Sequence, residues 1–159
     1  MYLKDLKKRR FLPKRPLLDL SISMDKSVLT FPYQYKWIEF GKVFNPYIPI
    51  LIKARWGWQN LWFLVDSGAD TTMLTLSLAN QLGLEINKNK KTKLFGIGEN
   101  SVIAYPGKIN LKIGNFIIDA RCYFIDAEDS TLLLGRLDIF DKFNIYFDST
   151  NQKVIFNHI

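Results

Sequence analysis

The feature that most constrains the fold is a series of short apolar segments, separated by turn residues at intervals of about 8–12 residues. Most of these segments are rich in β-branched or aromatic residues, and glycine, proline or asparagine commonly follows them. Many short strands with regularly spaced turns are typical of an all-β barrel or sandwich. The expected strands are residues 47–54, 61–66, 93–97, 101–105, 108–113, 116–124, 132–134, 144–148 and 153–157.

Two short helices are expected between these strands. Residues 75–82 have a good N-cap residue at Thr75, and Gly83 stands where a helix end favours a left-handed residue. Residues 137–143 form a second candidate. The sequence therefore predicts an all-β domain with one or two short helices.

The inventory of reactive side chains excludes several kinds of site. The 159 residues include one cysteine, Cys122, and one histidine, His158, which stands next to the C-terminus. A single cysteine cannot form an internal disulfide, and the pair is too few for a zinc or iron–sulfur cluster. We expect no metal, no cofactor and no Ser-His-Asp triad.

The net charge of +7 is concentrated at the N-terminus. Residues 1–15 carry seven basic side chains and one acidic side chain, whereas residues 45–159 carry twelve basic and eleven acidic ones. We interpret residues 1–27 as a basic flexible arm and residues 28–159 as the domain. The arm is either a solvated tail or a weak contact to nucleic acid or anionic lipid; we favour the tail.

Localisation follows from what the sequence lacks. No segment reaches the roughly 18 apolar residues of a membrane span. Residues 17–29 contain charged side chains that a signal peptide would exclude. We therefore expect the protein to be cytoplasmic.

An acidic turn at residues 63–72 is the sharpest local motif. An apolar strand delivers Asp66 directly into a turn of small residues, Ser67, Gly68 and Ala69. Ser67 can donate a hydroxyl hydrogen bond, and the Gly68 N–H can approach a carboxylate closely. Such a turn presents its acid, although Asp-Ser-Gly also occurs as an ordinary polar turn.

Two further motifs follow this turn in the sequence. Residues 94–102 predict a hairpin whose tip contains Gly96, Ile97 and Gly98, and which could close over a cleft or lie on the surface as an ordinary hairpin. Residues 132–136, Leu-Leu-Leu-Gly-Arg, predict a core strand that ends with a cation at its rim.

Taken in order, these three motifs resemble the retropepsin-like aspartic proteases over residues 45–159. Residues 31–49 and 140–148 are most similar to small predicted aspartyl proteases of prokaryotes. The resemblance implies a retropepsin-like acid-protease barrel. It also implies that Asp66 is the catalytic aspartate in an active-site turn completed by Ser67, Gly68 and Ala69, with Ser67 hydrogen-bonding across a dimer.

The resemblance assigns further residues to the site. Asp70 would bind the substrate backbone and form a partly buried ion pair with Arg136, which would brace the site. Residues 94–104 would form the flap, and Gly96, Ile97 and Gly98 would contact substrate.

An aspartic dyad needs two acids, and the chain has one clear acid turn, so the site would require a homodimer. The expected interface consists of the last strand, around residues 154–157, and segments near the N-terminal side of the domain. The sequence predicts an aspartic endopeptidase that cleaves extended segments of a peptide or protein substrate. Two alternatives remain: a catalytically silent homodimeric binding or scaffold protein with the same fold, and a nucleic-acid-associated protein led by the basic arm, against which the nearly neutral domain argues.

Overall fold

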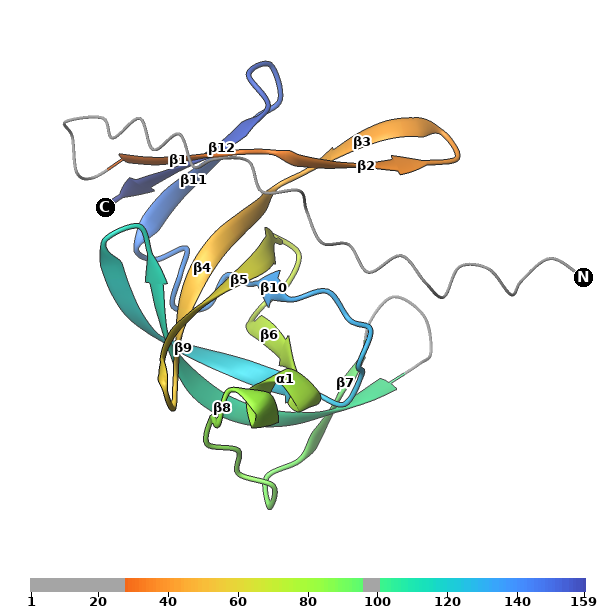
Figure 1. The fold of residues 1–159 in the computed structure, drawn as a ribbon, viewed down its shortest axis with the longest axis vertical. Coiled ribbons are helices and arrows are strands. Elements are labelled where there is room, and N and C mark those ends of the chain that lie inside the picture. The colour runs from red at the N-terminus through yellow and green to blue at the C-terminus, as the bar shows by residue number, and fades with distance from the viewer. Residues whose placement is uncertain (1–27, 96–100) are drawn as a thin grey trace, which may run out of the picture.

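The computed structural model describes residues 28–95 and 101–159, which form β-strands and one short helix (Figure 1). The predicted arm at residues 1–27 and the predicted hairpin tip at 96–100 lie outside these residues. The all-β class with one short helix is confirmed. The elements are β1 (Val28–Pro32), β2 (Gln34–Ile38), β3 (Gly41–Asn45), β4 (Tyr47–Ala54), β5 (Gly57–Val65), β6 (Thr72–Thr75), α1 (Leu76–Gln81), β7 (Thr92–Phe95), β8 (Ser101–Ile113), β9 (Phe116–Ile125), β10 (Leu133–Leu134), β11 (Phe143–Asp148) and β12 (Lys153–His158).

The largest sheet closes into a barrel. Its strand order is β4-β5-β10-β6-β9-β8-β7, and β4 also pairs with β8 through Leu51 with Lys112 and Ile52 with Leu111. This additional pairing joins one edge of the sheet to its far side, so β7 is left as the outermost strand. Within the described ranges, no helix has the length and apolarity needed to cross a membrane.

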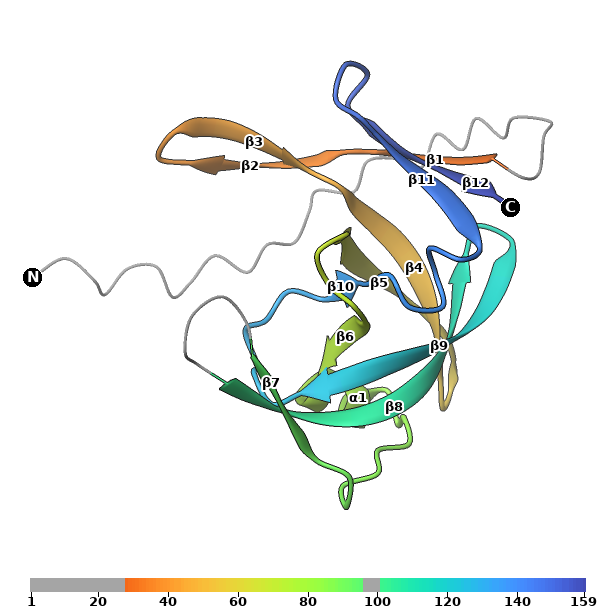
Figure 2. The ribbon, with the colours of Figure 1, turned by 180° about the vertical axis from the view of Figure 1, so that it is seen from behind.

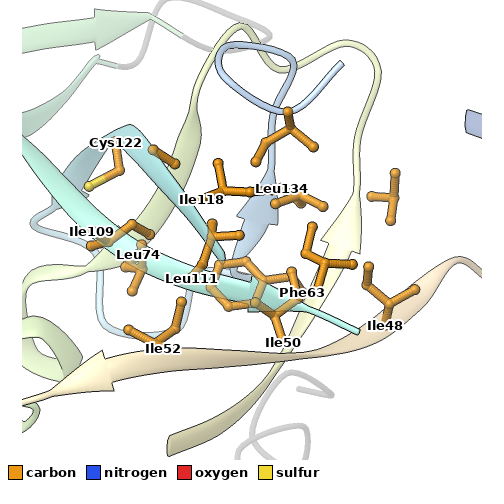
Figure 3. Packing of buried hydrophobic residues seen from close by; sticks show 14 of the residues in the cluster. Ile48, Ile50, Ile52, Phe63, Leu74, Ile109, Leu111, Ile118, Cys122 and Leu134 are labelled. Carbon is orange, nitrogen blue, oxygen red and sulfur yellow. The ribbon is translucent and has the colours of Figure 1, made fainter. Parts of the chain in front are cut away.

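Alternation along β4 shows why the barrel has an apolar interior. Ile48, Ile50 and Ile52 are fully buried, and the residues between them are only partly buried. Successive side chains of a strand point to opposite faces, so the three isoleucines share one face. They meet Phe63 and Leu111 from neighbouring strands in the core (Figure 3).

The helix forms as predicted. The side chain of Thr75 accepts a hydrogen bond from the backbone N–H of Leu78, which caps the N-terminus of α1. Gly83 adopts a positive φ of 66° just after the helix. A Cβ at this glycine would also lie 2.9 Å from the side chain of Arg55. Local capping signals therefore suffice to place this helix.

A second, three-stranded sheet has the order β1-β12-β11. Phe31 and Phe143 pack edge-on against Phe156 of β12, with ring centroids 5.8 and 5.5 Å away. Because β12 pairs with a strand on each side, it has no free edge. Residues 154–157 therefore cannot pair edge to edge with a partner chain, and the free edges of this sheet belong to β1 and β11. The place of this strand in a dimer interface stays a prediction.

The β2–β3 hairpin stands apart from both sheets and pairs with no other strand of the described chain. Figures 1 and 2 show it as a two-stranded ribbon that extends beyond the barrel on one side. The hairpin has a tight turn in which Ile38 pairs with Gly41, whose φ is 108°.

The predicted helix at residues 137–143 is wrong. The segment forms consecutive turns, in which the N–H groups of Ile139 and Phe140 both donate to the Arg136 carbonyl. Asp138 has a φ of 67°, in the left-handed region, which interrupts a right-handed helix.

Two strand boundaries also differ from expectation. β8 runs without a break through Pro106 and Gly107, which had been expected to form a turn. A Cβ at Gly107 would lie 2.4 Å from the ring of Phe124, so this glycine makes room for a core side chain. β5 begins earlier than expected, at Gly57, because residues 55–56 form the whole turn after β4.

Candidate active site

The acid turn begins where β5 ends. The backbone N–H of Asp66 donates to the Leu134 carbonyl at 3.1 Å, and its own carbonyl accepts from the Ala69 N–H at 3.2 Å. Its Oδ1 accepts from the Gly68 N–H at 2.8 Å. Ala69 is buried beneath the turn, whereas Ser67 and Gly68 are exposed. The turn therefore fixes a half-buried carboxylate beside small, accessible residues.

β10 lies against this turn and joins its two flanking strands. It pairs with β5 in parallel and with β6 in antiparallel orientation, so it lies between the strands that precede and follow the turn. A Cβ on Gly135 would lie 2.3 Å from the backbone carbonyl of Thr71, and the Gly135 N–H donates to Thr72 Oγ1 at 3.3 Å. Only glycine allows this close approach, which explains the residue type after the apolar strand.

The same crossing brings Arg136 to Asp70. The Arg136 N–H donates to the Ala69 carbonyl at 3.0 Å, and the Leu137 N–H donates to the Asp70 carbonyl at 2.9 Å. The guanidinium Nη2 of Arg136 donates to Asp70 Oδ1, so the two side chains expected to pair are in contact.

The expected burial of this pair is wrong for a single chain. The Arg136 and Asp70 side chains are 53% and 83% exposed. An exposed ion pair contributes about 0–1 kcal/mol to stability. The backbone hydrogen bonds, rather than the ion pair, therefore hold these two segments together, and the bracing role stays a prediction.

The stem of the predicted flap is present. β7 and the start of β8 pair from Thr92 with Ala104 to Phe95 with Ser101. Gly96, Ile97 and Gly98 fall in residues 96–100, outside the described part of the chain. In Figure 1 the loop between β5 and β6, which carries Asp66, lies between the β2–β3 hairpin and the β7–β8 hairpin, and both point to the same side.

A second ion pair beside the turn was missed by the sequence analysis. The Arg121 backbone N–H and Nε donate to Asp138 Oδ2 at 2.8 and 2.9 Å, and Nη2 donates to Oδ1 at 2.7 Å. Mainly through the side-chain hydrogen bonds from Arg121, the pKa of Asp138 falls to about 2. No sequence signal joins these residues, because they are brought together by the contact of β9 with the turns after β10.

The two ion pairs line one shallow hollow. Its lining includes Asp70 and Arg136 of the first pair and Arg121 and Asp138 of the second. The flank of the acid turn is therefore strongly charged, in contrast to the apolar barrel interior.

Two other side chains have reactive chemistry, Cys122 and His158. Cys122 is buried, and burial raises the pKa of its thiol to about 12. His158 stacks on Phe116, with ring centroids 4.2 Å apart. Within residues 28–95 and 101–159, no group of three or more histidine, cysteine or acidic side chains is placed to hold a metal ion.

A sequence profile described as aspartyl protease matches residues 52–136, which is more than half of the chain. The chain belongs to the aspartyl protease family. The matched segment runs from β4 through the acid turn and the flap stem to Arg136, and so contains every residue that the sequence analysis assigned to the site.

The fold of the chain is the retropepsin-like barrel, and the chain is similar to solved structures of proteases and a protease-like domain. A retropepsin-like aspartic protease from Rickettsia conorii is 26% identical, with a TM-score of 0.55 over 83% of this chain and 94% of that chain. EIAV protease complexed with the inhibitor HBY-793 is 28% identical, with a TM-score of 0.44 over 58% and 82% of the two chains. The retroviral protease-like domain of Ddi1 from Leishmania major is 20% identical, with a TM-score of 0.48 over 70% and 93%. No curated protein matches the chain.

Proposed function

We propose that this aspartyl protease is a homodimeric endopeptidase that cleaves extended peptides with the Asp66 carboxylates of two chains. The observation that carries the proposal is the geometry of the turn, in which Asp66 ends a strand and is oriented by the Gly68 N–H. The sequence contains Asp-Ser-Gly only once. A second copy of the chain would supply the second acid across a two-fold axis.

The chemistry follows from two carboxylates in close contact. At about 3 Å they cannot both be ionised, so they share one proton. The ionised Asp66 takes a proton from water as the water oxygen attacks the peptide carbonyl carbon, and the protonated Asp66 donates to the carbonyl oxygen. A carboxyl group then donates a proton to the peptide nitrogen while the other takes one from the diol. The C–N bond breaks, and the pair again holds one proton.

Neighbouring residues would position the substrate and the turn. Ser67 is exposed and close to the expected two-fold axis, which suits a hydrogen bond to the partner chain. Asp70 is exposed beside Asp66 and can accept hydrogen bonds from the N–H groups of an extended peptide. Gly96 and Gly98 at the flap tip would offer backbone groups to the opposite side of that peptide.

The test is peptide cleavage by the full chain at mildly acidic pH, compared with Asp66→Asn. The amide keeps the size of the carboxylate but cannot take a proton from water, so cleavage should fall to background. It should not fall by half, because one gene supplies both acids. Folding and association should be unchanged.

Asp119→Asn is the matched control, because Asp119 is an exposed carboxylate on β9 whose side chain, within the described part of the chain, bonds only to Asn110. Its activity should equal that of the wild type. Cleavage that survives in Asp66→Asn would refute the assignment. A wild-type chain that folds, dimerises and binds peptides without cleaving any would favour the binding or scaffold alternative.

A further inference from the structure

We infer that the β2–β3 hairpin is an interface arm that packs against the partner chain of the dimer; this inference rests on the proposed function. The hairpin carries large apolar side chains that the single chain leaves uncovered. Trp37 is 72% exposed and Phe40 is 87% exposed, and Tyr35 and Ile38 are also exposed. A cluster of this kind on one element marks an interaction surface.

The hairpin is fully paired in the single chain, although it joins neither of the other two sheets. A lone two-stranded hairpin is marginally stable in water. This one is paired along its whole length, from Gln34 with Asn45 to Ile38 with Gly41. Tyr35 and Phe44 pack across the strands, with ring centroids 6.3 Å apart, and Lys42 Nζ lies 4.1 Å from the Tyr35 ring centroid. The aromatic face is thus formed in advance of any contact.

Register places these residues on one face. Tyr35 pairs with Phe44, and Trp37 pairs with Lys42. Residues two apart on a strand point to the same face, so these four side chains share one face of the ribbon. Phe40 lies in the turn at the tip of the hairpin. The face is rich in aromatic residues, which dominate the energy of protein interfaces.

The direction of the hairpin identifies the occupant. It points to the same side of the molecule as the β7–β8 hairpin, and the loop that carries Asp66 lies between the two (Figures 1 and 2). In the proposed dimer each chain supplies one acid turn, so the second Asp66 would meet the first at this loop. The arm therefore extends toward the space that a second copy must enter.

The sheet topology and the size of the aromatic face support the same occupant. Since β12 is paired on both sides, it cannot add strands of the partner. Aromatic side chains bury about 150–250 Å² each when covered, so three from each of two arms would supply a large share of the ~1,200–2,000 Å² of a specific interface. The arms would meet the partner symmetrically, as an isologous contact requires.

The experiment compares the association of the full-length wild type with that of the double variant Trp37→Ser, Phe40→Ser by sedimentation equilibrium. The dimer dissociation constant should rise by about tenfold or more, the effect of removing interface aromatics. Both side chains are exposed, so circular dichroism should show an unchanged fold. Matched controls are Trp56→Ser and Ile117→Ser, which remove side chains that are 63% and 64% exposed on other elements. Their dissociation constants should stay at the wild-type value.

Activity separates this inference from the proposed function. At protein concentrations above its raised dissociation constant, the double variant should regain the wild-type rate per dimer, whereas Asp66→Asn should remain inactive but dimeric. Equal association of double variant and wild type would overturn the arm while leaving the dyad intact. A raised KM with unchanged association would also overturn it, because the hairpin would then bind substrate. If dimerisation depends on the hairpin but neither the wild type nor Asp66→Asn cleaves peptides, the inference about the hairpin is supported and the catalytic dyad is refuted.

Discussion

At the scale of single residues, Asp138 makes a contribution to stability that depends on pH. Three hydrogen bonds from Arg121 stabilise its ionised form, and the folded-state pKa lies at about 2, below the ordinary value of 3.8. A depressed carboxylate pKa stabilises the fold above the unfolded pKa, and this contribution is lost as the pH falls from about 4 to about 2. Asp138 therefore stays ionised under the mildly acidic conditions that suit an aspartic dyad.

Asp138→Asn should reduce the free energy of unfolding at neutral pH by about 1 kcal/mol, a value kept small because the Arg121 side chain is 57% exposed. The difference between variant and wild type should shrink between pH 4 and pH 2. Urea unfolding at a fixed protein concentration measures both quantities. Asp119→Asn serves as the control, and a constant difference at all pH values would contradict the linkage to Asp138.

At the scale of elements, the crossing of β10 beneath the acid turn depends on Gly135. The Cβ of an alanine would meet the backbone carbonyl of Thr71 at 2.3 Å, and backbone atoms cannot rotate away as a side chain can. The segment that carries Arg136 would have to move from the segment that carries Asp70. The turn and the strand beneath it thus form one structural unit.

Gly135→Ala should destabilise the fold by about 1–3 kcal/mol or more and reduce peptide cleavage, because the acid turn moves with its support. Thermal unfolding and cleavage rates on the same preparation measure the two effects. Adding Thr71→Ala should give no rescue, since the contact involves the backbone of Thr71. Recovery of stability in that double variant would show that the side chain of Thr71, not its backbone, causes the conflict.

At the scale of the whole molecule, the proposed reaction uses two carboxylates and a water and no other reactive group. Cys122 is buried in the barrel, and its raised thiol pKa, about 12, keeps it protonated and unreactive. Peptide cleavage should therefore resist both EDTA and iodoacetamide, and its rate should peak below neutral pH, where the pair of acids holds one proton. Loss of the wild-type rate in EDTA would contradict a purely carboxylate mechanism.

The sequence determined those features whose physical cause is local. The Asp-Ser-Gly turn follows an apolar strand within a few residues, and the cap at Thr75 and the left-handed Gly83 delimit the helix between them. The apolar segment 47–54 likewise predicted a strand, which the structure has as β4. These predictions succeed because each depends on neighbours in the chain.

Only the tertiary structure decided which distant segments meet. Asp138 faces Arg121 because the turns after β10 pack on β9, and this contact gives 137–143 a left-handed residue where a helix was expected. β12 lies between β1 and β11, although its sequence does not distinguish a central strand from an edge strand. The exposure of Asp70 and Arg136 is also a property of the assembled surface. Strand order, burial and ion pairing across many residues depend on the relative placement of whole elements, which local patterns do not encode.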